Sequence, residues 1–202
     1  MTVALVPAAL DVGIRPWGLS DAAELAAMYT AAAADLAVEE PWCGSEFLTP
    51  AGQRERVRRC LDDHTAEGFV ITVAGAIAGH LSLARIRGDI LDSADIGYWV
   101  APCRRGHGIA TRAIGLAAVH AFELLGLRRL HATTGADNLA SRRALEANGF
   151  QMVGVTHDLA LVGGGWGDGC LYQLTAAGWL VSRPSRRTWR PLPGSTGPCA
   201  DG

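Results

Sequence analysis

Short stretches of alternating or consecutive apolar residues mark out β-strands along the chain. The stretch at 94–100 shows the alternation clearly, because Ile96, Tyr98 and Val100 share one face before Pro102 ends the strand. The turn at 74–76 joins two of the stretches as a hairpin. The predicted strands are 12–16, 69–73, 77–86, 94–100, 130–134, 151–162 and 170–174.

Between these strands, apolar residues spaced three or four positions apart predict helices. Asp21 and Glu24 have capping-box spacing in front of a helix that runs to about 34. Thr49 and Pro50 form an N-cap and first position for a second helix, which reaches about 66. A long helix follows the strand at 94–100, and a short helix at 138–148 ends at Gly149.

The turn at 104–108 connects the strand at 94–100 to the long helix. Gly106 and Gly108 permit positive φ and let a ligand approach the backbone amides. Unpaired N–H groups and the positive end of the helix dipole favour an anion here, and Arg104 and Arg105 add positive charge. A plain strand-to-helix connection also favours glycine, so it is the alternative to an anion site.

Length and composition fit one folded domain followed by a tail. The chain has 202 residues, of which 49% are hydrophobic and 19% charged, so residues 1–182 can form one domain with a full core. Residues 183–202 are rich in Pro, Gly, Ser and Arg without any apolar period. We expect this segment to be a disordered tail.

The charge balance argues against several classes of partner. A net charge of -2 gives no overall attraction to nucleic acid or to an anionic membrane, and no apolar run is long enough to span a membrane. All 18 basic residues are arginines, which excludes a Schiff-base or P-loop lysine. Six dispersed histidines argue against a metal site, and five cysteines without CxxC spacing favour the reducing cytoplasm.

Two sequence motifs carry a resemblance to a known family. The glycine turn reads R-G-H-G-I-A over 105–110, matches the pattern R-x-x-G-x-A, and directly follows D-I-G-Y-W-V over 95–100. This combination resembles the acetyl-CoA-binding region of the GCN5-related N-acetyltransferases (GNAT), and the strand is similar to that of their RimJ/RimL-like branch. A second motif, Asn138-x-x-Ser141 followed by Gly149-Phe150, resembles the next shared stretch of that branch.

The resemblance implies a mixed α/β fold, the GNAT fold, in which helices flank a twisted and mostly antiparallel central sheet. Neighbouring parallel strands of that sheet splay apart at the acetyl-CoA site. A backbone N–H at a bulge around 99–101 is implied to polarise the thioester carbonyl, and no metal is implied. The implied acetyl-CoA-binding residues are Val100, Arg105, Gly106, His107, Gly108, Ile109, Ala110, Thr111, Asn138 and Ser141.

The implied reaction is direct transfer of acetyl from acetyl-CoA to a primary amine, without an acyl-enzyme intermediate. Ser141 is the candidate acid or hydrogen-bond donor for the leaving thiolate, and a helix cap is the alternative role of Asn138 or Ser141. Asp95 is the candidate base, because a partly dry cleft makes a carboxylate more basic, and a structural salt bridge is its alternative role. RimL-like enzymes place a glutamate after the Gly-Phe motif, where this chain has Ala160 beside Asp158.

The acceptor is expected where the chain differs most from that branch. The acidic loop at 38–49 could attract a cationic amine or simply be solvated, and the glycine-rich run at 163–169 is expected to be a flexible hairpin. The branch implies a protein N-terminal α-amine, including that of a ribosomal protein, or a small amine. A CoA-binding regulatory module without catalysis is the alternative from another class, and a homodimer stays open. The candidate acceptor-binding residues are Trp42, Trp99, Asp158 and Trp166.

Overall fold

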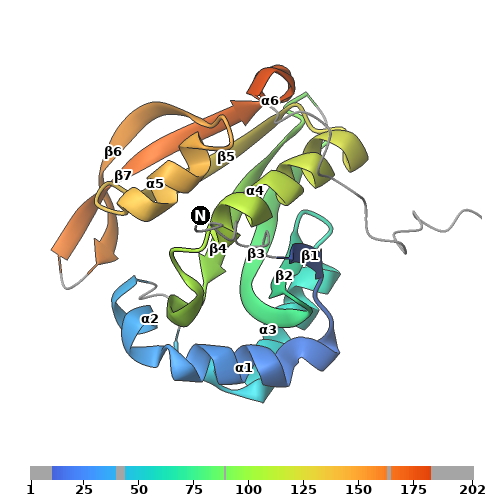
Figure 1. Ribbon diagram of the computed structural model, residues 1–202, viewed down its shortest axis with the longest axis vertical. Coiled ribbons are helices and arrows are strands. Elements are labelled where there is room, and N and C mark those ends of the chain that lie inside the picture. Colours follow the sequence, from blue (N-terminus) through green and yellow to red (C-terminus); the bar gives the residue numbers. More distant parts are fainter. Residues whose placement is uncertain (1–10, 40–43, 89, 163–164, 183–202) are drawn as a thin grey trace, which may run out of the picture.

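A computed structural model describes residues 11–39, 44–88, 90–162 and 165–182 of the chain. The predicted tail at 183–202 and the candidate residue Trp42 lie outside these ranges. Within them, helices pack on both faces of one twisted sheet (Figure 1).

Seven strands form the sheet in the order β1-β2-β3-β4-β5-β7-β6. Neighbouring strands are antiparallel except β4 and β5, which are parallel because a helix returns the chain between them. The predicted strands at 12–16 and 151–162 have the observed bounds. The strands are β1 (Val12–Pro16), β2 (Glu67–Val73), β3 (Ala76–Arg87), β4 (Ser93–Val100), β5 (Arg129–Gly135), β6 (Gln151–Val162) and β7 (Gly165–Thr175).

The helices begin where the sequence offers caps and small residues. Thr49 caps α3 as predicted, since its Oγ1 accepts a hydrogen bond of 3.1 Å from the backbone N–H of Gly52. No helix in the described ranges is long and apolar enough to cross a membrane. The α-helices are α1 (Ala22–Ala31), α2 (Ala33–Glu39), α3 (Pro50–Asp62), α4 (Ile109–Val119), α5 (Leu139–Glu146) and α6 (Ala176–Ser182), and a π-helical turn (His120–Leu124) continues α4.

The structure differs from the sequence-based expectations in four local features. The capping box does not form: the Asp21 carboxylate accepts from the guanidinium of Arg15, and Glu24 accepts from the backbone N–H of Ile77. The predicted hairpin between the last two strands is present, but Gly165–Gly169 forms part of β7, because it pairs with β6 and, at Gly169, with β5. Helix α6 was not predicted at all, and the helix that begins at Pro50 ends at Asp62, earlier than expected.

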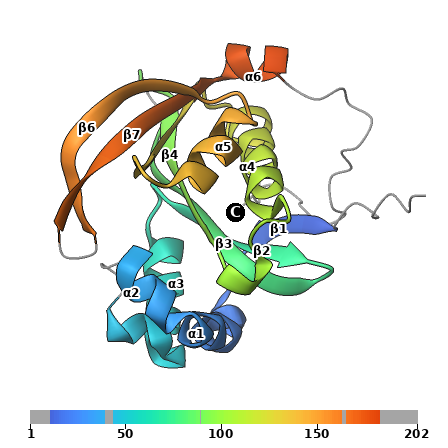
Figure 2. The same ribbon diagram turned by 60° about the vertical axis from the view of Figure 1, so that its left-hand side comes forward.

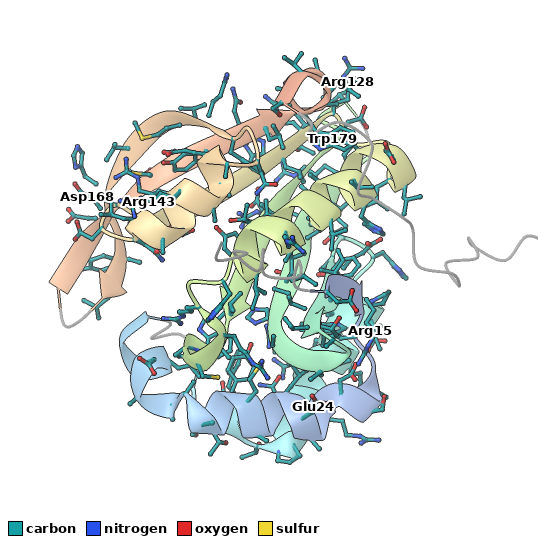
Figure 3. The ribbon with its side chains drawn as sticks, in the orientation of Figure 1. Arg15, Glu24, Arg128, Arg143, Asp168 and Trp179 are labelled. Atoms are coloured by element: carbon teal, nitrogen blue, oxygen red, sulfur yellow. The ribbon has the colours of Figure 1, made fainter. Side chains whose placement is uncertain are left out.

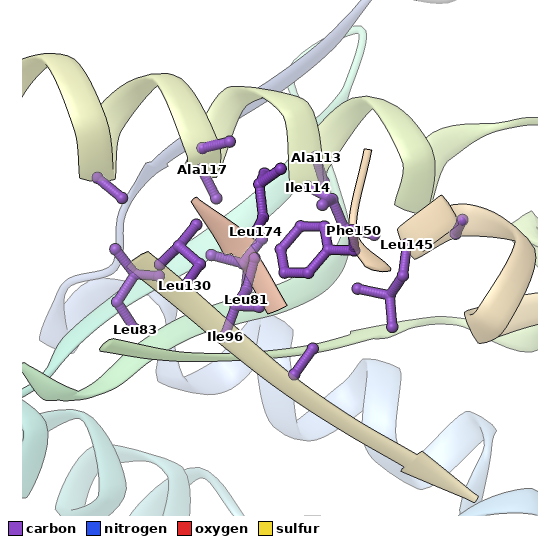
Figure 4. Close-up of a cluster of buried hydrophobic side chains, with 14 of the residues drawn as sticks. Leu81, Leu83, Ile96, Ala113, Ile114, Ala117, Leu130, Leu145, Phe150 and Leu174 are labelled. Carbon is purple, nitrogen blue, oxygen red and sulfur yellow. The ribbon is translucent and has the colours of Figure 1, made fainter. Parts of the chain in front are cut away.

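The two faces of the sheet carry different layers, as the two views of the ribbon show (Figures 1 and 2). Leu81, Ile96 and Leu130 project from β3, β4 and β5 into a buried core beneath α4, which contributes Ala113 and Ile114 (Figure 4). A second, smaller core lies on the opposite face, where α1 and α3 cover only part of β2, β3 and β4; its buried members include Leu25, Tyr29, Val57, Val70 and Trp99. The remaining part of that sheet face is not covered by α1 or α3, and a cleft lies there.

Candidate active site

Strands β4 and β5 separate in the middle of the sheet. They pair only from Ser93 to Asp95, opposite Arg129 to His131, and no later residues of the two strands pair. The backbone N–H of Ala101 donates to the carbonyl of Ala78 on β3. Because antiparallel strands alternate the direction of their amides, the N–H groups of residues 98 and 100 point away from β3, toward this gap.

The bulge expected around 99–101 does not occur. The pairing of β3 with β4 is regular from Asp95 to Val100, and its register shift lies in β3, between Ala84 and Arg87. Strand alternation alone therefore directs the amides of β4 into the gap. An N–H group in such a position can hydrogen-bond a thioester carbonyl oxygen as negative charge develops on it.

The glycine turn after β4 has the geometry of an anion site. Gly106 and Gly108 have φ of 78° and 73°, and a Cβ built on either residue would meet no other atom within 4 Å. Gly108 is the N-cap of α4, so the first-turn amides of that helix lie beside an open backbone surface. The Arg105 side chain donates to the carbonyl of Val100 at 3.1 Å and ties the turn to β4. The turn therefore fits a pyrophosphate.

Ser141 lies on the α4 side of the sheet and contacts β4. Its backbone N–H donates to the side chain of Asn138 at 3.0 Å, so Asn138 caps α5. The Ser141 Oγ lies 2.7 Å from the hydroxyl of Tyr98. Burial, partly opposed by this hydrogen bond, raises the pKa of Tyr98 to about 12, which keeps its phenol protonated at neutral pH. Sequence reasoning assigned Tyr98 only to the apolar alternation of its strand.

Two titratable side chains lie at the start of the gap, on the opposite face. Asp95 forms an ion pair with Arg85, which matches the salt-bridge role left open for it above. His131 of β5 is the register partner of Asp95. Burial foremost, and then the charges of Arg129 and Arg85, lower the pKa of His131, so its imidazole is neutral at pH 7 and able to accept a proton. Sequence reasoning missed His131, because nothing in the local pattern of the strand at 130–134 shows that it lies opposite Asp95.

These side chains border two adjoining cavities on the sheet face that α1 and α3 leave open. The smaller cavity, of about 210 Å³, lies at the gap and is lined by Ser82, Gly97 and Thr133 together with Asp95. The larger, of about 390 Å³, continues along the strands past Ser93 and His131. The two cavities share Arg85, Asp95, Ala132 and Thr133, so they form one continuous cleft.

A family model described as the acetyltransferase (GNAT) domain matches residues 11–151. The chain belongs to the GNAT acetyltransferase family. It is thus an acetyl-CoA-dependent N-acetyltransferase, and the splayed parallel pair with the glycine turn confirms the expected fold.

Individual relatives agree with this GNAT assignment. The probable N-acetyltransferase YjcK of Bacillus subtilis is 32% identical over 128 residues, which cover 61% of this chain and 71% of that protein. A structure of Mycobacterium smegmatis RimJ in complex with CoA-disulfide is 31% identical, with a TM-score of 0.77 and 82% of each chain covered. The ribosomal-protein-S5-alanine acetyltransferase of Vibrio fischeri is 26% identical, with a TM-score of 0.78, and covers 83% of this chain and 94% of its own.

Three of the residues that the sequence predicted to bind the acceptor lie away from the cleft. Trp99 is only 5% exposed and stacks on Tyr29 in the smaller core, so it is a packing residue. Trp166 and Asp158 lie on the outer part of the β6–β7 hairpin, near Asp168, which Figure 3 labels at the end of the molecule opposite Trp179. Neither of them lines the two cavities.

Proposed function

We propose that this GNAT enzyme acetylates the α-amine at the N-terminus of a protein. The observation that carries the proposal is the shape of the cleft, which runs along the strands from Gly97 past Ser93. Four residues of a strand span about 13 Å, which suits an extended peptide end better than a compact amine. The similarity to a ribosomal-protein-S5-alanine acetyltransferase supports the same class of acceptor.

We further propose that acetyl-CoA lies on the α4 side of the gap. Backbone amides of 105–111 would hold the pyrophosphate of acetyl-CoA. Val100 and Asn138 would contact the remainder of the acetyl-CoA molecule. The thioester carbonyl would then accept from the amides of β4 in the gap. Ser141, hydrogen-bonded to Tyr98, would donate a proton to the sulfur as the carbon–sulfur bond breaks.

The proton of the attacking amine would leave on the opposite face. The neutral imidazole of His131 is suited to accept it, directly or through water, as the nitrogen bonds to the carbonyl carbon. Asp95, the base expected from the sequence, would assist by its charge while it remains paired with Arg85. No covalent enzyme intermediate is needed, because the amine attacks the thioester directly.

A peptide panel tests the proposed function. The full chain is mixed with acetyl-CoA and either a peptide with a free α-amine, the same peptide with its N-terminus blocked, or a set of small amines, and free thiol is measured. Of the three kinds of acceptor, we expect only the peptide with a free α-amine to give thiol release. Higher kcat/KM for a small amine would refute the peptide acceptor, and acetyl-CoA binding without transfer to any amine would favour a regulatory module.

A further inference from the structure

Three arginines border the large cavity, at the end of the cleft away from the gap. Arg87 pairs with Ser93, and Ser93 pairs with Arg129, so one row across β3, β4 and β5 has a guanidinium on each side of a serine. Asp95 lies two residues nearer the gap than Ser93 along β4. Asp95 and its ion-pair partner Arg85 also line the cavity. The cavity therefore has three arginines and one carboxylate along its wall.

The backbone of β3 is distorted to bring the third arginine to this face. Arg85 has φ of 50°, in the left-handed region that residues with a Cβ rarely adopt. It lies in the register shift between Ala84 and Arg87, where a bulge turns a side chain toward the opposite face of the sheet. In a regular strand Arg85 would point to the face opposite its neighbour Ala84. Strain of this kind is concentrated at functional sites.

The positive charge of this wall is only partly neutralised. Asp95 pairs with Arg85, and the described residues provide no carboxylate within ion-pair distance of Arg87 or Arg129. The Nε of Arg129 is buried and has no hydrogen-bond partner among the described residues. A buried donor without a partner costs free energy, so the hydrogen-bonding capacity of the Arg129 guanidinium is incompletely used.

We infer that the arginine wall, defined by Arg85, Arg87 and Arg129, binds a carboxylate of the acceptor peptide. This inference rests on the proposed function and names the substrate class more closely: an N-terminus that carries an acidic side chain. The arginine row lies four residues along β4 from Gly97, or about 13 Å. An extended peptide with its α-amine at the gap would reach the row with its fourth or fifth residue. Polyamines, which carry only positive charge, would be repelled.

Matched peptides test the inference. The full chain is assayed with free-amine peptides that carry Glu or Gln at the second, third, fourth or fifth position and are otherwise identical. We expect kcat/KM to be about tenfold higher for Glu than for Gln at the fourth or fifth position, because a carboxylate accepting from guanidinium groups forms a charge-assisted hydrogen bond. Arg87→Gln and Arg129→Gln should each bring the Glu-to-Gln ratio close to one.

The control variant is Arg58→Gln, on the exposed face of α3, which should keep the wild-type ratio. An unchanged KM for acetyl-CoA shows that each variant is folded. Equal kcat/KM for Glu and Gln peptides at every position would overturn the inference but leave the proposed function intact. A raised KM for acetyl-CoA in Arg87→Gln and Arg129→Gln would also overturn it, because the wall would then serve the cofactor. If no peptide is acetylated, the proposed function and the inference both fail.

Discussion

The hydrogen bond between Tyr98 and Ser141 gives the most exacting test of the proposed chemistry. Tyr98→Phe removes one hydroxyl and leaves the ring in place, so Ser141 Oγ loses its partner at 2.7 Å. A net hydrogen bond is worth about 1 kcal/mol, and if it orients Ser141 in the transition state its loss lowers kcat about fivefold. Ser141→Ala removes the proposed acid itself and should lower kcat by about 100-fold.

The assay is steady-state thiol release at saturating acetyl-CoA, with the KM for acetyl-CoA measured alongside. Because the pKa of Tyr98 is about 12, its phenol does not titrate near neutral pH, and Tyr98→Phe should keep the wild-type shape of the pH profile. Tyr29→Phe is the control. It also loses a hydroxyl hydrogen bond, at 2.6 Å to His80, but lies in the smaller core and should lose stability without loss of kcat.

The double variant separates positioning from independent action. If Tyr98 acts only through Ser141, adding Tyr98→Phe to Ser141→Ala should cause no further loss of kcat. Wild-type kcat in Tyr98→Phe, in a protein that binds acetyl-CoA normally, would refute the reasoning. Multiplying losses in the double variant would refute it as well, because Tyr98 would then act directly on the reacting atoms.

Two further predictions concern the glycine turn and the base. Gly108→Trp should abolish acetyl-CoA binding in calorimetry. The control Gly75→Trp, at a turn with a similar positive φ and similarly open surroundings, should bind acetyl-CoA normally. Equal affinity in both variants would show that the pyrophosphate does not bind at the glycine turn. The wild-type kcat/KM should fall as pH drops through the lowered pKa of His131, below 6.5, because the imidazole becomes protonated and stops accepting protons. His131→Gln should lose this acid limb along with most of its activity, and a limb that persists in the variant would assign it to another group.

Much of the fold could be predicted because local patterns and tertiary packing agree in most of the chain. Strands β1 and β6 and the cap at Thr49 follow from short-range signals that the structure retains. Gly165–Gly169 was misjudged because glycine has low strand propensity, and only its pairing with β6 and β5 makes it a strand. Such pairing depends on residues far apart in sequence, so local propensity does not reveal it.

The candidate site was predictable where a motif is continuous and hidden where it depends on the sheet. The glycine turn is a single stretch, whereas Tyr98 meets Ser141 across 43 residues of sequence and resembles an apolar strand residue. The bulge at Arg85 could not be predicted from the sequence either. A positive φ is usually signalled by glycine or asparagine, and this position has an arginine. Trp99 illustrates the reverse error, since an aromatic residue near a predicted site lies in the smaller core.

The alternation of side chains along β4 lets one short strand contact both substrates in the proposed arrangement. Tyr98 faces α4 and α5, where it meets Ser141, while Asp95 and Gly97 face the open cleft. The gap toward β5 connects the two faces only beyond residue 95, because the strands are paired up to that point. The acyl donor and the acceptor can therefore enter from opposite faces and meet at the gap. Extending the pairing of β4 with β5 by two residues would close the gap and separate the substrates without altering any proposed catalytic side chain.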